Sequence, residues 1–282
     1  MDCAAFAARL PTLFPDDDVF AAAPLDPRFA DVVKRVDGMT TAHSLALLNL
    51  AAGLLGSHEI YLEVGSYRGR SVVGAALGAD HDRFVAVENF REFGVSADEG
   101  EHRIRATLAE WDLTDRVRLH RGDAFRLVPL GLLNRPVGVY FYDGVHSRLA
   151  QYLALGIVEP FLADEALVVI DDASWPQVER STASYVRRHP GYQLLFDLAA
   201  DRQYDPKWCN GMKVYAWRRP AGWRPPARAD LAWRRGLHLY AHEPALTFAW
   251  RVLPRFPRLS ATLKRLYLHG GSQVPDSREP VR

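Results

Sequence analysis

The feature of this sequence that most constrains its fold is an alternation, between residues 59 and 217, of short apolar runs with longer helical patterns. The runs are rich in β-branched and aromatic residues, which favours strands. Seven strands are predicted, at residues 59–64, 83–88, 116–120, 137–142, 166–170, 192–198 and 213–217. Apolar strands separated by helices are typical of a mainly parallel sheet that helices cover on both faces. We therefore predict a doubly wound α/β fold with a seven-stranded sheet.

Composition divides the chain into three predicted parts. Residues 1–40 contain four prolines and are expected to form an N-terminal cap with a short helix. Residues 41–219 form the α/β domain, which opens with an amphipathic helix over residues 41–55. Residues 220–282 form a helical C-terminal extension. In a sheet of the predicted kind, ligands bind at the carboxyl ends of the strands, so the site is expected there.

The extension is strongly basic. Residues 219–282 contain 12 Lys and Arg against four Asp and Glu, whereas the whole chain has a formal net charge of +1. Arg-rich helices are predicted within residues 238–268, and the last dozen residues are expected to be disordered. Contact with an anionic membrane surface, binding of an acidic partner, and packing on the core as an arm of a homodimer all stay open. We favour packing or dimerisation, and nothing indicates a nucleic-acid-binding module.

Composition also excludes several classes of protein. Two cysteines are too few for a disulfide framework or a cysteine-based zinc site. The first residues lack the basic and apolar regions of a signal peptide. The longest apolar stretch, residues 44–56, is too short to cross a bilayer. We therefore expect a cytoplasmic protein without a transmembrane segment, and only four lysines among 35 basic residues indicate a bacterial, GC-rich origin.

A glycine pattern lies between the first predicted strand and the helix that follows it. Gly65 permits a tight turn without a Cβ clash, and Gly69 permits close approach of the backbone to a ligand. An NAD-binding fingerprint needs a glycine where Tyr67 stands, which disfavours an NAD-dependent oxidoreductase. Glu88 ends the second strand, where a carboxylate accepts hydrogen bonds from ribose hydroxyls, although a solvated Glu at a strand end is the alternative. The pattern thus predicts a nucleoside cofactor.

Three carboxylates follow two further strands of the predicted sheet. Asp143 ends the fourth strand, and Asp171 and Asp172 end the fifth. Buried against apolar strand ends, they would repel one another, and a divalent cation with oxygen ligands would compensate. Mg²⁺ fits best, because it keeps coordination sites for water and substrate oxygens. The alternative is that these residues only cap a turn or begin a loop.

The pattern Glu63-x-Gly65-x-x-x-Gly69-x-Ser71 resembles the first motif of class I S-adenosylmethionine (SAM)-dependent methyltransferases. In particular, it is similar to the first motif of the metal-dependent O-methyltransferases of the catechol and caffeoyl-CoA type. It is also similar to the first motif of related enzymes that methylate sugar hydroxyls on natural products. The resemblance covers roughly residues 58–218 and implies a Rossmann-like methyltransferase fold. It implies that SAM is bound by Glu63, Gly65, Ser66, Tyr67, Gly69, Ser71, Glu88 and Asp123. Asp123 would meet the adenine amine, and a helix N-cap is its alternative role.

The same resemblance implies roles for the later acidic residues. The separation of 28 residues between Asp143 and Asp171, with Asp172 adjacent, matches the family's metal ligands. His146 stands where the family places a catalytic base, so His146 and Asp143 are the predicted catalytic residues; a histidine bonded only to backbone is the alternative. We predict Mg²⁺-assisted methyl transfer from SAM to a hydroxyl of a small-molecule acceptor. A methyltransferase without metal, and a non-catalytic nucleoside-binding or interaction protein of this fold, stay open.

Overall fold

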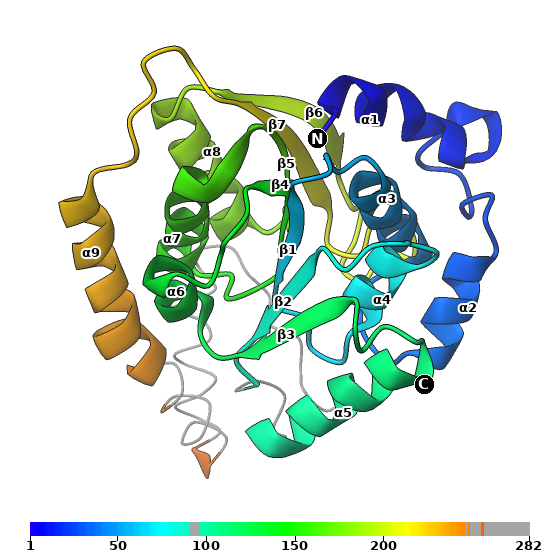
Figure 1. The fold of residues 1–282 in the computed structure, drawn as a ribbon, viewed down its shortest axis with the longest axis horizontal. Coiled ribbons are helices and arrows are strands. Elements are labelled where there is room, and N and C mark those ends of the chain that lie inside the picture. Colours follow the sequence, from blue (N-terminus) through cyan, green and yellow to red (C-terminus); the bar gives the residue numbers. More distant parts are fainter. Residues whose placement is uncertain (91–95, 246–247, 249–254, 257–282) are drawn as a thin grey trace.

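A seven-stranded mixed sheet with the strand order β3-β2-β1-β4-β5-β7-β6 forms the centre of the molecule (Figure 1). The computed structural model describes residues 1–90, 96–245, 248 and 255–256. The strands are β1 (Ile60–Val64), β2 (Phe84–Glu88), β3 (Val117–Arg121), β4 (Val137–Tyr142), β5 (Leu162–Ile170), β6 (Tyr192–Leu198) and β7 (Met212–Arg218). β7 pairs antiparallel with both of its neighbours, and the pairs among the first five strands are parallel. The prediction of a mainly parallel, seven-stranded sheet is confirmed.

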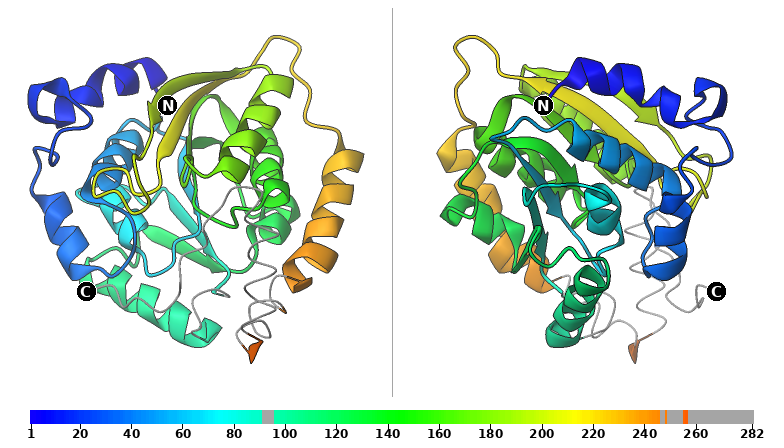
Figure 2. Two further views of the ribbon diagram at one scale, coloured as in Figure 1. Left: turned by 180° about the vertical axis from the view of Figure 1, so that it is seen from behind. Right: turned by 45° about the vertical axis from the view of Figure 1, so that its right-hand side comes forward.

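Helices cover both faces of this sheet, as Figure 2 shows. One face carries α3 (Ala42–Gly53), α4 (Arg70–Ala76) and α5 (Ala97–Glu110), and the other carries α6 (Ala124–Leu127), α7 (Arg148–Val158) and α8 (Pro176–Arg188). Because successive strand residues point to opposite faces, two separate apolar cores form, one on each side of the sheet. The short 3₁₀ turns are η1 (Pro11–Leu13), η2 (Pro15–Asp17), η3 (Val128–Leu130) and η4 (Glu159–Phe161).

Two elements differ from their prediction. β5 begins at Leu162, four residues before the apolar run, because the exposed Asp164 and half-buried Glu165 hide its first half from a hydrophobicity pattern. The helix α3 was expected to be amphipathic, but most of its side chains on all sides are buried. The reason is that α3 lies between the sheet and the N-terminal segment, so no side of this helix faces solvent along its whole length.

The N-terminal segment is more structured than a cap with one short helix. It contains α1 (Cys3–Arg9) and α2 (Arg28–Arg35) besides two 3₁₀ turns. The guanidinium group of Arg70, at the start of α4, donates to the carbonyl oxygens of Val36, Thr40 and Val33 at 2.6, 3.1 and 3.2 Å. The indole Nε1 of the fully buried Trp208 donates to the carbonyl oxygen of Val19 at 3.0 Å. These contacts attach the segment to the α/β core.

The C-terminal extension begins with α9 (Arg228–Leu237), followed by a wider helical turn, η5 (His238–His242). α9 packs on α7, with Arg234 lying over the ring of Tyr152 at 4.6 Å from its centroid (Figure 1). Packing on the core is thus observed for this part of the extension. Most of residues 238–268, and the end predicted to be disordered, lie outside the described residues. Within the described ranges, no helix has the length and apolar character needed to span a membrane.

We predict that Gly65→Ala destabilises the protein by more than about 3 kcal/mol. Gly65 has φ of +93°, where a side chain costs roughly 1–3 kcal/mol, and a Cβ there would overlap the backbone carbonyl of Asp143. Chemical unfolding measures this difference. The matched control is Gly131→Ala, because Gly131 has the same φ of +93° but nothing within 4 Å of the added atom. Equal losses in the two variants would show that the contact with Asp143 contributes nothing.

Candidate active site

The loop between β1 and α4 has an unusually tight backbone. Gly65, Tyr67 and Gly69 all have positive φ, at +93°, +47° and +91°. The backbone N–H of Gly69 donates to the carbonyl oxygen of Ser66 at 2.7 Å, which closes the turn before α4 begins. Because Gly65 has no Cβ, the loop passes directly against the backbone of Asp143. The glycines predicted from the sequence are therefore required by the geometry of this loop.

Glu63 lies beneath this loop and is fully buried. The hydroxyl groups of Ser71 and Tyr61 each donate to one of its carboxylate oxygens, both at 2.9 Å. Burial raises the pKa of Glu63 to about 7, although the hydroxyls of Ser66, Ser71 and Tyr61 oppose this shift. The structure thus places Glu63 as an internal support that joins β1 to α4. Contact of Glu63 with a cofactor, directly or through water, stays a prediction.

Glu88 connects the loops that follow β1 and β2. Its Oε2 accepts the backbone N–H of Tyr67 at 2.8 Å, and its Oε1 accepts that of Phe90 at 2.7 Å. Each carboxylate oxygen has two acceptor sites, so both oxygens keep one for a hydroxyl group. The predicted position of Glu88 at the carboxyl end of β2, beside the glycine loop, is therefore observed. Contact with a ribose stays a prediction.

Asp123 is the N-cap of α6. Its Oδ1 accepts the backbone N–H of Phe125 at 2.8 Å, which satisfies one of the free donors at the helix start. The sequence left open whether Asp123 caps a helix or meets an adenine. The structure shows that Asp123 caps the helix. The capping hydrogen bond uses only one of its two carboxylate oxygens.

Asp143, Asp171 and Asp172 lie together at the ends of β4 and β5, which are hydrogen-bonded neighbours. The backbone N–H of Asp143 donates to the carbonyl oxygen of Val64 at 2.9 Å, so this group adjoins the glycine loop. Asp171 and Asp172 are buried. Burial and repulsion by Asp172 raise the pKa of Asp171. The predicted convergence of the three carboxylates is therefore observed, and their role as metal ligands stays a prediction.

His146 faces this acidic group from the turn before α7. Its Nε2 lies 2.9 Å from Oδ2 of Asp172 and 3.7 Å from Oδ1 of Asp143. Burial alone would raise the pKa of Asp172, but attraction to His146 and hydrogen bonds from His146 and Asn210 outweigh it and lower that pKa. One ligand atom comes from each of Asp143, His146 and Asp172, and these atoms lie within 4.8 Å of one another. The three residues therefore form a possible metal-binding group. Asp171 is not part of this group.

Two further residues, Asn210 and Trp175, contact this group. The Nδ2 of Asn210 donates to Oδ1 of Asp172 at 2.7 Å. The ring of Trp175 lies edge-on against that of His146, with 5.2 Å between centroids. Both residues stand close in sequence to strands that end at this site, but no spacing pattern indicates which atoms they contact. Trp208, also near in sequence, points into the core instead and is fully buried.

A cavity of about 270 Å³ lies elsewhere, beneath the N-terminal segment. Phe29 and Asn49 are among the residues that line it. The Nδ2 of Asn49 donates to the carbonyl oxygen of Leu77 at 2.9 Å, beyond the last turn of α4. Because the glycine loop adjoins the first turn of α4, this cavity lies at the opposite end of that helix. It is not part of the site.

Residues 62–173 match the model of a family described as a methyltransferase domain. No curated protein shows a match to this chain. The matched segment begins in β1 and ends just after Asp172, so it contains the glycine loop and all of the acidic residues described above. It also contains His146.

Solved structures are similar to this chain over most of its length. An O-methyltransferase from Bacillus cereus in complex with S-adenosylhomocysteine has 14% identity and a TM-score of 0.52, covering 74% of this chain and 100% of that one. Cofactor-bound Rv0187 from MTB has 18% identity and a TM-score of 0.53, covering 77% and 96%. The O-methyltransferase TomG from Streptomyces achromogenes, in complex with SAM, has 17% identity and a TM-score of 0.52, covering 70% and 92%.

The sheet order and the similar structures show a Rossmann-like methyltransferase fold, and residues 62–173 match a methyltransferase domain. The segment with the glycine loop and the acidic residues is thus the part of the chain that matches a methyltransferase domain. This confirms the resemblance inferred from residues 63–71.

We predict that the stability of the protein depends on pH through Glu63. The folded-state pKa of Glu63, about 7, lies above that of an exposed carboxyl, because the buried group favours its neutral form. The contribution of Glu63 to the free energy of unfolding is therefore fully present below about pH 4.5 and is lost as the pH rises through 7. Glu63→Gln cannot ionise and should gain up to about 3 kcal/mol relative to the native protein between pH 5 and 8. Urea unfolding at several pH values measures the difference.

The control for this measurement is Glu110→Gln, which changes an exposed carboxylate on α5. Its difference from the native protein should stay nearly constant over the same pH range. A Glu63→Gln difference that is equally constant would show that the buried carboxyl is not protonated at neutral pH.

Proposed function

We propose that this enzyme transfers the methyl group of SAM to a hydroxyl oxygen of a small-molecule acceptor, with assistance from a divalent metal ion. The observation that best supports this is the convergence of Asp143, His146 and Asp172 directly beside the glycine loop. Polar groups suited to bind and deprotonate a hydroxyl therefore lie next to the proposed position of the methyl donor. The names of the Bacillus and Streptomyces neighbours, and the description of TomG as involved in tomaymycin synthesis, support oxygen as the accepting atom.

The glycine loop fits the proposed cofactor. An added Cβ at Gly65 would overlap the backbone carbonyl of Asp143, so the glycine lets the loop lie at the end of β1 directly beside the acidic residues. Glu88 keeps acceptor sites for hydroxyl groups at the end of β2. When bound, SAM supplies a methyl group on a positively charged sulfur. The residues that we propose to hold it are Glu63, Gly65, Ser66, Tyr67, Gly69, Ser71, Glu88 and Asp123.

The proposed metal is Mg²⁺, held by Asp143, Asp171 and Asp172. Carboxylate oxygens are ligands that Mg²⁺ prefers, and a cation would relieve the repulsion that raises the pKa of Asp171. A bound ion would lower the pKa of an acceptor hydroxyl. Ligand atoms of Asp143 and Asp172 lie within 4.8 Å of each other, which supports binding of an ion by these two of the three proposed ligands.

His146 is the proposed general base. Asp172 accepts a hydrogen bond from Nε2 of His146 at 2.9 Å, which holds the imidazole in a defined orientation at the edge of the site. Asn210 in turn holds Asp172, so the carboxylate cannot rotate freely. A base held in this way can take the proton of the acceptor hydroxyl as the methyl group is transferred. Trp175, which packs against the imidazole, limits its movement on another side.

The short contact between His146 and Asp172 also supports a second candidate function. A carboxylate that orients a histidine is sufficient for proton removal in many enzymes without a metal. In that case the acidic residues would position the base and no ion would be required. The reaction would still be methyl transfer from SAM to oxygen.

We expect calorimetry to show that S-adenosylhomocysteine binds in a 1:1 complex and that NAD does not. Glu88→Ala should weaken this binding by at least about tenfold, because it removes a charged acceptor near the proposed ribose position. Glu110→Ala, on the exposed surface of α5, is the control and should leave the affinity unchanged. Binding of NAD without S-adenosylhomocysteine would refute the proposal.

We expect activity to depend on both a metal and His146. Release of S-adenosylhomocysteine is measured with catechol, phenol and methyl glucoside as trial acceptors, before and after dialysis against EDTA. Chelation should remove activity and Mg²⁺ should restore it, while His146→Ala should lower kcat by about 10²–10⁴-fold. Asp164→Asn, at the opposite and exposed end of β5, is the control for the acidic residues.

The outcomes of this assay separate the candidates. Activity that survives chelation but is lost in His146→Ala supports the metal-free reaction. Binding of S-adenosylhomocysteine without turnover of any trial acceptor points to a non-catalytic protein of this fold.

A further inference from the structure

The outer side of the C-terminal extension carries exposed apolar side chains. Trp233 and Leu237 of α9 and Tyr240 of η5 have exposed fractions of 70%, 42% and 75%. Spacings of four and then three residues place them on the same side of the helical segment. Figure 1 shows α9 at the edge of the molecule, with α7 between it and the sheet. These three side chains are called the apolar face below.

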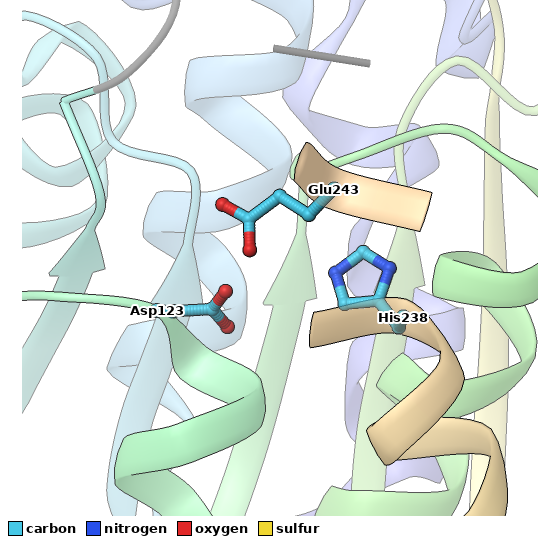
Figure 3. A group of neighbouring side chains, drawn as sticks. All are labelled: Asp123, His238 and Glu243. Carbon is cyan, nitrogen blue, oxygen red and sulfur yellow. The ribbon is translucent and has the colours of Figure 1, made fainter. Parts of the chain in front are cut away.

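The opposite side of the extension is already covered by the domain. Figure 3 shows His238 and Glu243 on the helical turns that follow α9, beside Asp123 at the start of α6. Both His238 and Glu243 are buried, and the ring of Phe125 packs edge-on against that of His238 at 4.5 Å between centroids. The extension is thus attached to the domain by its inner side, while the apolar face stays accessible to a partner.

The apolar face lies in a basic part of the chain. Three arginines in or next to α9 have no ion-pair partner among the described residues: Arg224, Arg228 and Arg235. Asp230 is the only acidic residue between residues 219 and 240. From the domain, the guanidinium group of the exposed Arg126 lies 5.6 Å from the centre of the Tyr240 ring. The rings are therefore accompanied by positive charge that nothing in the described chain neutralises.

We propose that the apolar face docks the protein on an anionic lipid membrane, with its side chains at the level of the headgroups. Helices that lie in the membrane interface combine Trp, Tyr and Leu with basic residues. The apolar side chains enter the boundary of the acyl chains, and the arginines attract anionic headgroups. Residues 219–282, with 12 Lys and Arg against four Asp and Glu, have the charge that complements such a surface.

The size of the apolar face favours a membrane over a second copy of this chain. A stable dimer interface buries about 800 Å² on each partner. Full burial of a Trp or Tyr side chain covers roughly 150–250 Å², so two rings and one Leu provide about half of that area. A lipid surface needs no matching protein surface, because each side chain that enters it contributes separately. Docking of this kind is independent of methyl transfer.

Flotation of the full chain with lipid vesicles tests the proposal. We expect the protein to float with vesicles of equimolar phosphatidylcholine and phosphatidylglycerol, and not with phosphatidylcholine alone. Raising NaCl to about 0.5 M should weaken the binding, because salt screens the attraction between arginines and headgroups. The fluorescence of Trp233 should shift to shorter wavelength as its ring leaves water, and Trp233→Phe should remove this shift.

Two double variants separate the apolar and the charged contributions. Trp233→Ser/Tyr240→Ser should weaken binding to the mixed vesicles by at least about tenfold, because two rings lose their burial in lipid. Its control is Leu25→Ser, which removes an exposed apolar side chain from the N-terminal segment.

Arg224→Gln/Arg228→Gln should weaken the same binding by removing two charges near the lipid surface. Arg187→Gln/Arg188→Gln is its control, since both of these arginines are exposed at the end of α8. Neither control should change vesicle binding. All four variants should bind S-adenosylhomocysteine like the native protein, which verifies that they are folded.

The proposal is overturned if the native protein does not bind the mixed vesicles. It is also overturned if Trp233→Ser/Tyr240→Ser binds them as tightly as the native protein, because another part of the chain would then make the contact. A dimer seen by analytical ultracentrifugation without lipid, and dissociated by the same double variant, would overturn it in favour of a second copy on the apolar face.

Discussion

The contact between Gly65 and the backbone of Asp143 is the constraint on which the rest of the site depends. It brings the turn after β1 against the end of β4, and the backbone hydrogen bond from Asp143 to Val64 fixes the distance between them. Only glycine permits this approach, since it combines a positive φ with the absence of a Cβ. The proposed methyl donor and the proposed acceptor groups are adjacent because of this one contact.

Charge at the carboxyl edge of the sheet is balanced by a few specific partners. Glu63 is supported from below by hydroxyl groups and has a raised pKa. Asp172 has a lowered pKa because His146 and Asn210 contact it, although its neighbour Asp171 has a raised one. Carboxyl groups close in space thus favour different protonation states. Such a difference is what separates binding groups from acid–base groups in an active site.

Much of the fold followed from local patterns in the sequence. The ranges predicted for β4 and β6 agree with the structure at both ends, and those of the other strands differ at their ends only. The sequence did not predict the early start of β5, because Asp164 and Glu165 are polar. Even so, Glu165 takes part in the backbone pairing with β7. The burial of α3 on all sides was missed because the N-terminal segment covers it, and that contact has no local signal.

The sequence by itself determined the alternation of strands and helices, the glycine turn, and the presence of acidic residues at strand ends. These features follow from periodicity and from the conformational limits of single residues, which act over a few positions. The tertiary structure alone decided which atoms meet: Asn210 with Asp172, Trp208 with Val19, and Arg70 with the carbonyl groups of the N-terminal segment. It also placed His238 and Glu243 beside Asp123. The physical reason is that burial brings together residues far apart in the chain, and no local pattern encodes such distances.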